Sequence, residues 1–337
     1  MRRFLGKAIV ALSSVLAAGL LVAASDVPPP WAYGFASPPP ATAAPPAAPA
    51  APAAAPAPED TSLKELPGSS GKFTLTQIRD GFGPADWYPG DHPQMPEIVA
   101  RGRRPDVRAC SLCHYPNGKG RPENAGVSGL PYAYFVQQLA DFRSGDRKSA
   151  DSRKANTNIM IAIAKGMTDE DIKQAAQYFS SMPWTPWIRV VEASVVPKTR
   201  IAGGMFLRLE GEATEPIGDR IIETPEDVER TERLRDPRAG FIAYVPVGSL
   251  KKGEALVTTG GGGKTVRCAT CHGADLKGLG PVPGLAGRSP SYTVRQLYDM
   301  QTGARKGLWS ELMKPVVANL TNDDMLAIAA YTASRVP

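Results

Sequence analysis

Two stretches of the chain show the hydrophobic periodicity of an amphipathic helix behind a polar start. The first starts at Thr168 and carries apolar residues three and four positions apart: Ile172, Ala175, Ala176 and Phe179. The second starts at Thr321 and repeats the pattern with Met325, Ile328, Ala329 and Tyr331. Each start resembles a capping box, because an acidic residue follows the threonine three positions later. We therefore expect helices over 168–180 and from residue 321 onward.

Shorter patterns complete two helical units. We expect helices at 96–102 and 132–142 in a first unit, residues 93–183, and at 252–257 and 292–300 in a second unit, residues 248–337. Residues 61–92 precede the first unit and are rich in turn residues, as in Asp80-Gly81-Phe82-Gly83-Pro84. The chain of 337 residues is long enough for two domains.

The two units are copies of one plan. An offset of 158 carries a set of first-unit residues onto identical residues of the second: His114, Tyr134, Gln138, Asp141 and Arg147-Lys148. Beyond this stretch the offset becomes 153 and carries Met160 to Met313 and Thr168 to Thr321. The first unit therefore has five extra residues in the loop expected before its methionine. An internal duplication explains the match.

Residues 184–247 separate the units and carry no motif to which we assign a chemistry. Trp187–Val196 is rich in β-branched residues and is typical of a strand. Thr224-Pro225-Glu226 resembles a helix start with proline at the first helical position, leading a polar helix to about Arg235. The mixed charges of Glu223–Arg238 indicate a solvated face. We expect an irregular segment that packs between the two units.

A pair of short motifs carries the chemistry. Cys110-Ser111-Leu112-Cys113-His114 and Cys268-Ala269-Thr270-Cys271-His272 both have the C-x-x-C-H spacing of covalent haem c attachment. The motifs contain all four cysteines of the chain, so they leave none for a disulfide framework. One motif alone also supplies too few ligands for a structural zinc site. We predict two haem c groups, held by Cys110 and Cys113 and by Cys268 and Cys271.

The histidine of each motif, His114 or His272, fills one axial position of the iron. For the opposite position the repeat offers Met160 and Met313, and a thioether there is typical of electron-transfer cytochromes. Met167 is a rival in the first unit, but its counterpart is Leu320, which favours a core role. His92, the third histidine of the chain, is a further alternative ligand, although it has no counterpart in the second unit.

The N-terminus is typical of an export signal. Basic residues at 2, 3 and 7 precede an apolar run at 8–24 that ends in small residues. Residues 1–25 are thus a signal peptide or, alternatively, an uncleaved anchor in the inner membrane. Residues 26–60 are rich in proline and alanine, so we expect a disordered spacer that buries no core. Because bacteria attach haem c outside the cytoplasm, we expect a periplasmic protein.

Both units resemble class I c-type cytochrome domains, and the pair resembles dihaem cytochromes c of the c-four type. The resemblance rests on the haem motifs and on a group of second-unit residues: Gly284-Leu285-Ala286-Gly287-Arg288, Tyr292, Gln296-Leu297, Gly303-Ala304-Arg305 and Met313. It implies a mainly α fold of two tandem haem-centred domains. It also implies that Pro283, Tyr134 and Tyr292 pack in the haem pockets. Ala125 replaces the expected proline in the first unit, and Tyr115-Pro116 replaces the usual glycine.

The function that this resemblance implies is transfer of single electrons between redox proteins, from a dehydrogenase donor to an oxidase acceptor. A dedicated cytochrome subunit of a dehydrogenase or oxidase complex is one alternative. A dihaem peroxidase is another, but two methionine-ligated irons argue against it, so we do not expect an enzyme. The net charge of +6 is diffuse and no basic run with aromatics occurs, which excludes a nucleic-acid partner. A mildly basic surface favours an acidic redox partner.

Overall fold

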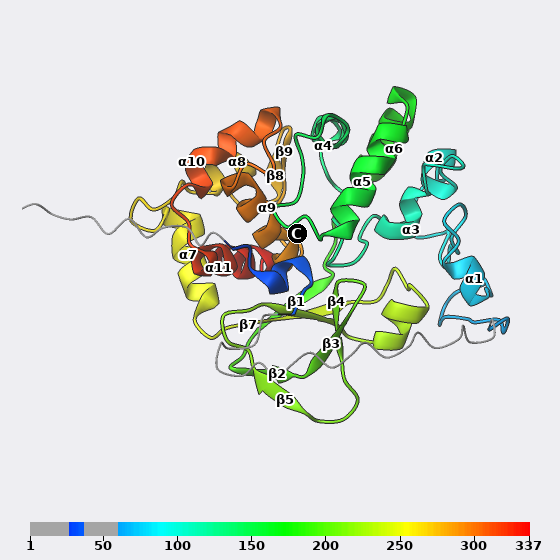
Figure 1. The fold of residues 1–337 in the computed structure, drawn as a ribbon, viewed down its shortest axis with the longest axis horizontal. Helices are drawn as coiled ribbons and strands as arrows, with labels where there is room; N and C mark the ends of the chain where they lie inside the picture. The colour runs from blue at the N-terminus through cyan, green and yellow to red at the C-terminus, as the bar shows by residue number, and fades with distance from the viewer. Residues whose placement is uncertain (1–26, 37–59) are drawn as a thin grey trace, which may run out of the picture.

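The computed structural model describes residues 27–36 and 60–337, with two helical units lying beside a group of strands (Figure 1). We call residues 93–183 unit 1 and residues 248–337 unit 2. The last helices of the units, α6 (Asp169–Ser180) and α11 (Asn322–Ala333), begin where the sequence pattern places them. In each, the hydroxyl of Thr168 or Thr321 accepts a hydrogen bond from the N3 amide, and the N3 aspartate accepts one in return. Both predicted capping boxes are confirmed.

The other helices of unit 1 include one that the sequence analysis missed. Unit 1 also contains α2 (Glu97–Ala100), α3 (Cys110–His114), α4 (Tyr132–Ser144) and α5 (Ala155–Gly166). Met160 lies within α5. A loop at residues 145–154 precedes this helix, as expected, but the five residues directly before the methionine are helical. The helix has no side-chain cap at Lys154 and carries an almost unbroken apolar run, so it lacks the usual start signal and the amphipathic pattern.

Unit 2 is built around α11, which is buried along nearly its whole length. Its other elements are α7 (Ser249–Thr259), α8 (Ala269–His272), the hairpin β8–β9 (Gly278–Leu279 and Val282–Pro283), α9 (Pro290–Gln301), the 3-10 helix η3 (Leu308–Met313) and α10 (Lys314–Val317). Helix α11 packs against α7 and α9. Gly253 allows the closest approach, because a Cβ there would collide with the carbonyl of Ala327.

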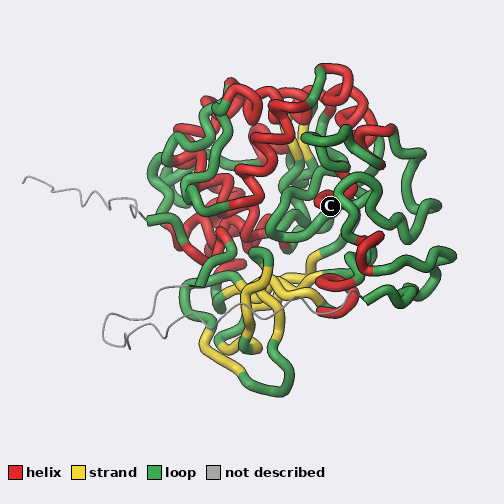
Figure 2. The backbone as a smooth tube through the Cα atoms, turned by 45° about the vertical axis from the view of Figure 1, so that its right-hand side comes forward, coloured by secondary structure: helices red, strands yellow, loops and turns green. Residues whose placement is uncertain are grey.

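Residues 184–247 form strands that lie together beneath the helices (Figure 2). Strands β1 (Ile188–Glu192), β7 (Phe241–Val245) and β6 (Ile222–Pro225) form one sheet, with β7 parallel to β1 and antiparallel to β6. Two antiparallel pairs join it: β2 (Val195–Pro197) with β5 (Thr214–Pro216), and β3 (Thr199–Ala202) with β4 (Met205–Arg208). The segment is therefore more regular than expected, although its first strand lies within the predicted range.

The helix predicted from Thr224 is wrong. Thr224 and Pro225 end the buried strand β6, and only a π-helical turn, η2 (Glu229–Arg233), follows. Glu223 and Asp236 are buried, so the charged run is not a solvated face throughout. The burial of β6 between β7 and unit 2 outweighs the local helix-start chemistry. Glu223 accepts hydrogen bonds from Ser289 Oγ (2.9 Å) and the Ser291 amide (3.1 Å) at the start of α9.

The N-terminal part of the proline- and alanine-rich stretch also departs from expectation. Residues Pro30–Tyr33 form a 3-10 helix, η1, which packs against α9 and buries Trp31, Ala32 and Tyr33 in the core of unit 2. We call residues 30–33 the N-terminal plug. The aromatic rings supply the apolar surface that a Pro/Ala composition lacks. The remaining spacer residues, 37–59, and the apolar run at 8–24 lie outside the described residues.

The lead-in residues 60–92 pack onto the middle segment. They contain α1 (Leu75–Ile78), and Trp87 and Tyr88 form a small core with Leu66, Ile78 and Leu234. The indole of Trp87 donates a hydrogen bond to the carbonyl of Leu234 at 2.8 Å. Across residues 27–36 and 60–337, we find no helix with the length and apolar character needed to cross a membrane.

The two units meet across a pseudo-twofold axis. The amide of Lys148 donates to the carbonyl of Ala304, and the amide of Lys306 donates to the carbonyl of Asp146, both at 2.8 Å. These two bonds exchange under the offset of 158, so each unit presents the same turn to the other. The duplication therefore explains the interface as a pairing of equivalent surfaces.

Candidate haem-binding sites

In unit 1 the haem motif borders a cavity. Helix α3 is one short turn, so it places Cys110, Cys113 and His114 together on the wall of a small cavity of about 60 Å³. Ser111 points away from the cavity and donates to the carbonyl of Val99 at 2.8 Å, which fastens α3 to α2. The rest of the wall is mostly apolar: Phe135, Leu139, Met160, Ile163, Met167, Ala175 and Phe179. Such a wall suits a flat apolar macrocycle.

Both motif histidines are held in the same way. His114 Nδ1 lies 2.8 Å from the carbonyl oxygen of Ala125, and His272 Nδ1 lies 2.7 Å from that of Pro283. Burial lowers the pKa of each imidazole, which favours the neutral ring. A neutral ring that donates from Nδ1 keeps the Nε2 lone pair for a metal, and the carbonyl fixes its orientation.

The same contact explains how unit 1 manages without the expected proline. Ala125 and Pro283 are equivalent under the offset of 158, and both act through the backbone carbonyl. The substitution therefore leaves the hydrogen bond to the histidine in place. Pro283 lies in β9 and is half-buried beside His272, at the position where the sequence analysis expects packing in the pocket.

None of the four cysteines forms a disulfide, so all four are available for attachment of a haem. Burial raises the pKa of Cys110 to about 12 and that of Cys268 to about 11. The thiols of Cys110 and Cys268 are therefore protonated at neutral pH, which disfavours binding of a metal ion as thiolates. The described residues contain no cluster of three or more histidine, cysteine or acidic side chains that could hold a metal ion.

The candidate methionines lie on the elements that precede each last helix. Met160 on α5 lines the cavity of unit 1, together with Met167 at the end of the same helix. Both methionines thus line the cavity. Only the repeat favours Met160 over Met167 as the iron ligand, because Met160 corresponds to Met313. Met313 ends η3 and packs at the edge of the unit 2 core, as do Cys268 and Leu285.

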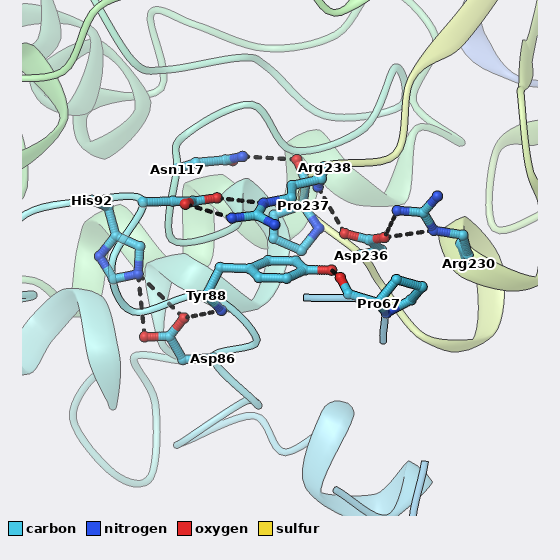
Figure 3. A network of polar contacts seen from close by, with 10 residues as sticks. Pro67, Asp86, Tyr88, His92, Asn117, Arg230, Asp236, Pro237 and Arg238 are labelled. Carbon is cyan, nitrogen blue, oxygen red and sulfur yellow. Dashed lines mark hydrogen bonds and ion pairs between the residues drawn. The ribbon is translucent and has the colours of Figure 1, made fainter. Parts of the chain in front are cut away.

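His92 takes another role. Its Nε2 lies 3.2 Å from Asp86 (Figure 3). Its Nδ1 lies 2.9 Å from the carbonyl of Pro93. Burial lowers the pKa of His92, but the contacts with Asp86 and Pro93 outweigh it, and the pKa is raised. The ring does not line the cavity of unit 1, and its edge faces Tyr178 instead.

Tyr134 and Tyr292 lie at the contact between the units, and Tyr134 does not line the cavity of unit 1. Arg147 donates to the hydroxyl of Tyr292 at 2.9 Å, and Arg305 donates to that of Tyr134 at 2.8 Å. Each guanidinium also bonds the side-chain oxygens of two glutamines, Gln138 and Gln296. The structure places both arginines in this buried network, which sequence reasoning missed. Their identity in the two repeats was the available signal.

The comparisons with known proteins identify two cytochrome c domains in the chain. The Cytochrome c family model matches residues 99–183 and 250–335, about half of the chain. A thiosulfate dehydrogenase electron acceptor of Stutzerimonas stutzeri is 40% identical over 237 residues, covering 69% of this chain and 82% of that protein. Cytochrome c4 of Azotobacter vinelandii is 23% identical over 227 residues, covering 66% of this chain and 82% of that protein.

Solved structures include two similar chains. One is a thiosulfate dehydrogenase of Marichromatium purpuratum, with a TM-score of 0.45 and 26% identity; the match covers 68% of this chain and 37% of that chain. The other is cytochrome c4 of Pseudomonas stutzeri, with a TM-score of 0.44 and 21% identity, covering 67% of this chain and 93% of that chain. The chain therefore belongs to the cytochrome c family, as a dihaem class I c-type cytochrome that binds two haem c groups covalently and transfers electrons rather than acting as an enzyme.

Proposed function

We propose that this chain is a periplasmic electron acceptor for a thiosulfate-oxidising dehydrogenase, with each haem iron held between a histidine and a methionine. The observation that carries the choice of partner is the 40% identity to a protein named as the electron acceptor of thiosulfate dehydrogenase. This proposal develops the alternative of a dedicated dehydrogenase subunit. A general respiratory carrier is the second candidate, which the likeness to cytochrome c4 favours.

In unit 1 the proposed axial pair is His114 and Met160. The cavity supports it, because both side chains lie on its wall and the Ala125 carbonyl orients the imidazole. In unit 2 the proposed pair is His272 and Met313, supported by the equivalent bond to Pro283 and by the repeat. A bound haem would supply a one-electron iron couple, and Met160 and Met313 as ligands would raise its reduction potential. The mostly apolar wall of the unit 1 cavity would keep water away from a porphyrin bound there.

The periplasmic location is supported by the export signal expected in residues 1–25 and by the haem motifs. Dehydrogenase and cytochrome would then meet in one compartment. Pro283 is proposed to pack against its haem, whereas Tyr134 and Tyr292 are proposed to act through the contact between the units.

The test is reduction of the exported dihaem protein by purified thiosulfate dehydrogenase supplied with thiosulfate. We expect both haems to become reduced, which the α band reports, and no reduction when either thiosulfate or the enzyme is omitted. Failure of reduction by this enzyme, with normal reduction by dithionite, would reject thiosulfate dehydrogenase as the donor.

The ligands are tested separately by visible spectra of oxidised protein. Met160→Leu and Met313→Leu should each remove about half of the methionine–iron band at the red end of the spectrum, because each haem contributes one such bond. Met167→Leu is the matched control and should keep the whole band. If Met167→Leu lost about half of the band and Met160→Leu kept the whole band, Met167 would be the ligand in unit 1.

A further inference from the structure

The duplication allows the same surface to be compared in the two units. Residues 112–123 of unit 1 correspond to residues 270–281 of unit 2 under the offset of 158. In unit 1 this surface is covered: Leu112 is 9% exposed, Tyr115 4% and Glu123 2%. In unit 2, Thr270 and Cys271 are exposed, and Leu279 is 60% exposed. The equivalent surfaces of the two units thus differ in solvent exposure: the unit 1 surface is covered and the unit 2 surface is open.

The middle segment covers the unit 1 surface. Arg235 donates to the carbonyl of Leu112, and its guanidinium lies 5.6 Å from the centre of the Tyr115 ring. Asn117 donates to the carbonyl of Pro237 at 2.7 Å (Figure 3). A partner protein can reach this surface of unit 1 only by displacing residues 184–247.

The mouth of the haem site differs between the units as well. In unit 1, Arg108 and Ile159 line the cavity mouth, and α5 begins at Ala155. Their counterparts in unit 2 are Val266, Leu312 and Leu308, the last of which begins η3. These three are 44%, 75% and 70% exposed. Unit 2 therefore has Val266 and Leu308 where unit 1 has Arg108 and Ala155, whereas Leu312 replaces Ile159, which is itself 40% exposed.

We call Val266, Leu279, Leu308 and Leu312 the unit 2 rim. Helix α8 with Cys271 contacts β8 with Leu279, so the rim adjoins the exposed haem motif. The hydroxyl of Thr265, next to Val266, donates to the carbonyl of Val316 in α10, and α10 contacts η3, which carries Leu308 and Leu312. Exposed apolar side chains on neighbouring elements indicate a protein interaction site. Arg267, Lys306 and Lys314 are exposed beside the rim, with Glu311 as an acidic neighbour that pairs with Lys314 at 2.7 Å. The surface around the rim is thus mainly basic.

We propose that unit 2 is the docking port, that is, the surface that binds the electron donor. We further propose that unit 1 receives its electrons from unit 2. The donor is a redox protein whose cofactor edge lies in an apolar patch bordered by acidic side chains. This inference rests on the proposed function only for the identity of that donor. In each transfer the donor loses one electron and the ferric iron of unit 2 becomes ferrous; the electron then passes to the ferric iron of unit 1. No proton or bond is exchanged in either step.

The experiment measures second-order rate constants for reduction of the full dihaem protein at low salt by stopped flow. The unit 2 variant is Val266→Glu/Leu308→Glu, and the matched unit 1 control is Arg108→Glu/Ile159→Glu. Three donors are compared: thiosulfate-reduced thiosulfate dehydrogenase, reduced flavodoxin as an unrelated acidic protein, and a neutral hydroquinone. We expect the unit 2 variant to lower the rate with both proteins about tenfold or more, because charge repulsion and loss of apolar contact both slow docking. The hydroquinone rate should stay unchanged, which shows that the haems are intact.

The outcomes separate the two proposals. Suppose that flavodoxin reduces the wild-type protein but the dehydrogenase does not, and that reduction by flavodoxin is slower in the unit 2 variant. This result would support the docking port on unit 2 and reject thiosulfate dehydrogenase as the donor. If the dehydrogenase reduces both variants at wild-type rates, the port is overturned while the proposed function stands. A unit 1 control that loses as much rate as the unit 2 variant, or more, also overturns the port.

Discussion

Lys154 offers a quantitative test of how the N-terminal plug is held. Its ammonium is buried at the junction of the plug and the two units, and it donates to the carbonyl of Tyr33 at 3.2 Å. Burial, with repulsion from Arg295, lowers the pKa of Lys154 from 10.5 to about 7, although Glu123, Asp151 and Asp299 oppose the shift. Between these two values the unfolded chain binds a proton that the folded protein does not, so stability rises with pH.

The size of the effect follows from the shift. Between about pH 7.5 and pH 8.5 the contribution grows by about 1 kcal/mol, which corresponds to about 1–2 °C in melting temperature for a chain of 337 residues. Below about pH 7 the lysine is protonated in both states, and its contribution no longer changes with pH.

The assay is thermal unfolding of wild type, Lys154→Met and Lys165→Met over this pH range. Lys154→Met should lose the rise of about 1 kcal/mol relative to wild type, because methionine keeps much of the packing without a titrating group. Lys165 is exposed and serves as the control, so Lys165→Met should keep the wild-type slope. Equal slopes in wild type and Lys154→Met would show that the lysine titrates normally and would refute the reasoning.

Two further predictions concern the unit interface and the last helix. Tyr134→Phe and Tyr292→Phe each remove a hydrogen bond from a buried guanidinium and should lower the free energy of unfolding by about 1.5–3 kcal/mol. In denaturant titrations we expect similar losses for both, and a difference of several-fold would contradict the pseudo-twofold equivalence. Burial raises the pKa of Asp324, but its contacts with Lys252 and Lys264 outweigh burial and hold the pKa below the usual value. The carboxylate therefore adds to the free energy of unfolding at neutral pH, and this contribution is lost as the pH falls below about 4. Asp324→Asn should therefore flatten the acid side of the stability curve, whereas an unchanged acid limb would disprove this role.

The sequence predicted the features that local chemistry controls. The haem motifs, the capping boxes at Thr168 and Thr321 and the duplicated helices all follow from spacing within a few residues. Helix α5 could not be predicted in the same way, because apolar residues occupy most of its sides and no cap marks its start. The ligand role of Met160 depends on this helix and stays a prediction.

Long-range packing explains the other differences. Thr224 and Pro225 resemble a helix start, but pairing of β6 with β7 decides their conformation. Tyr134 and Tyr292 resemble pocket residues in one unit taken alone, and only the meeting of two units brings an arginine to each hydroxyl. Arg235 reaches Leu112 across more than a hundred positions of sequence, and no local pattern announces this contact.

The N-terminal plug changes the geometry of any attachment to a bilayer. Arg295 donates to the carbonyl of Ala32, and Tyr33 donates to Asp299 at 2.7 Å, so the polypeptide is fastened to the body ahead of residues 37–59. Residues 37–59 then connect two fastened points of the same body, so they cannot act as a spacer between that body and a membrane. If the apolar run at 8–24 stays in a membrane, fewer than ten residues separate it from the plug. At about 3.5 Å per residue the protein would sit against the lipid headgroups, with little freedom to swing toward distant partners.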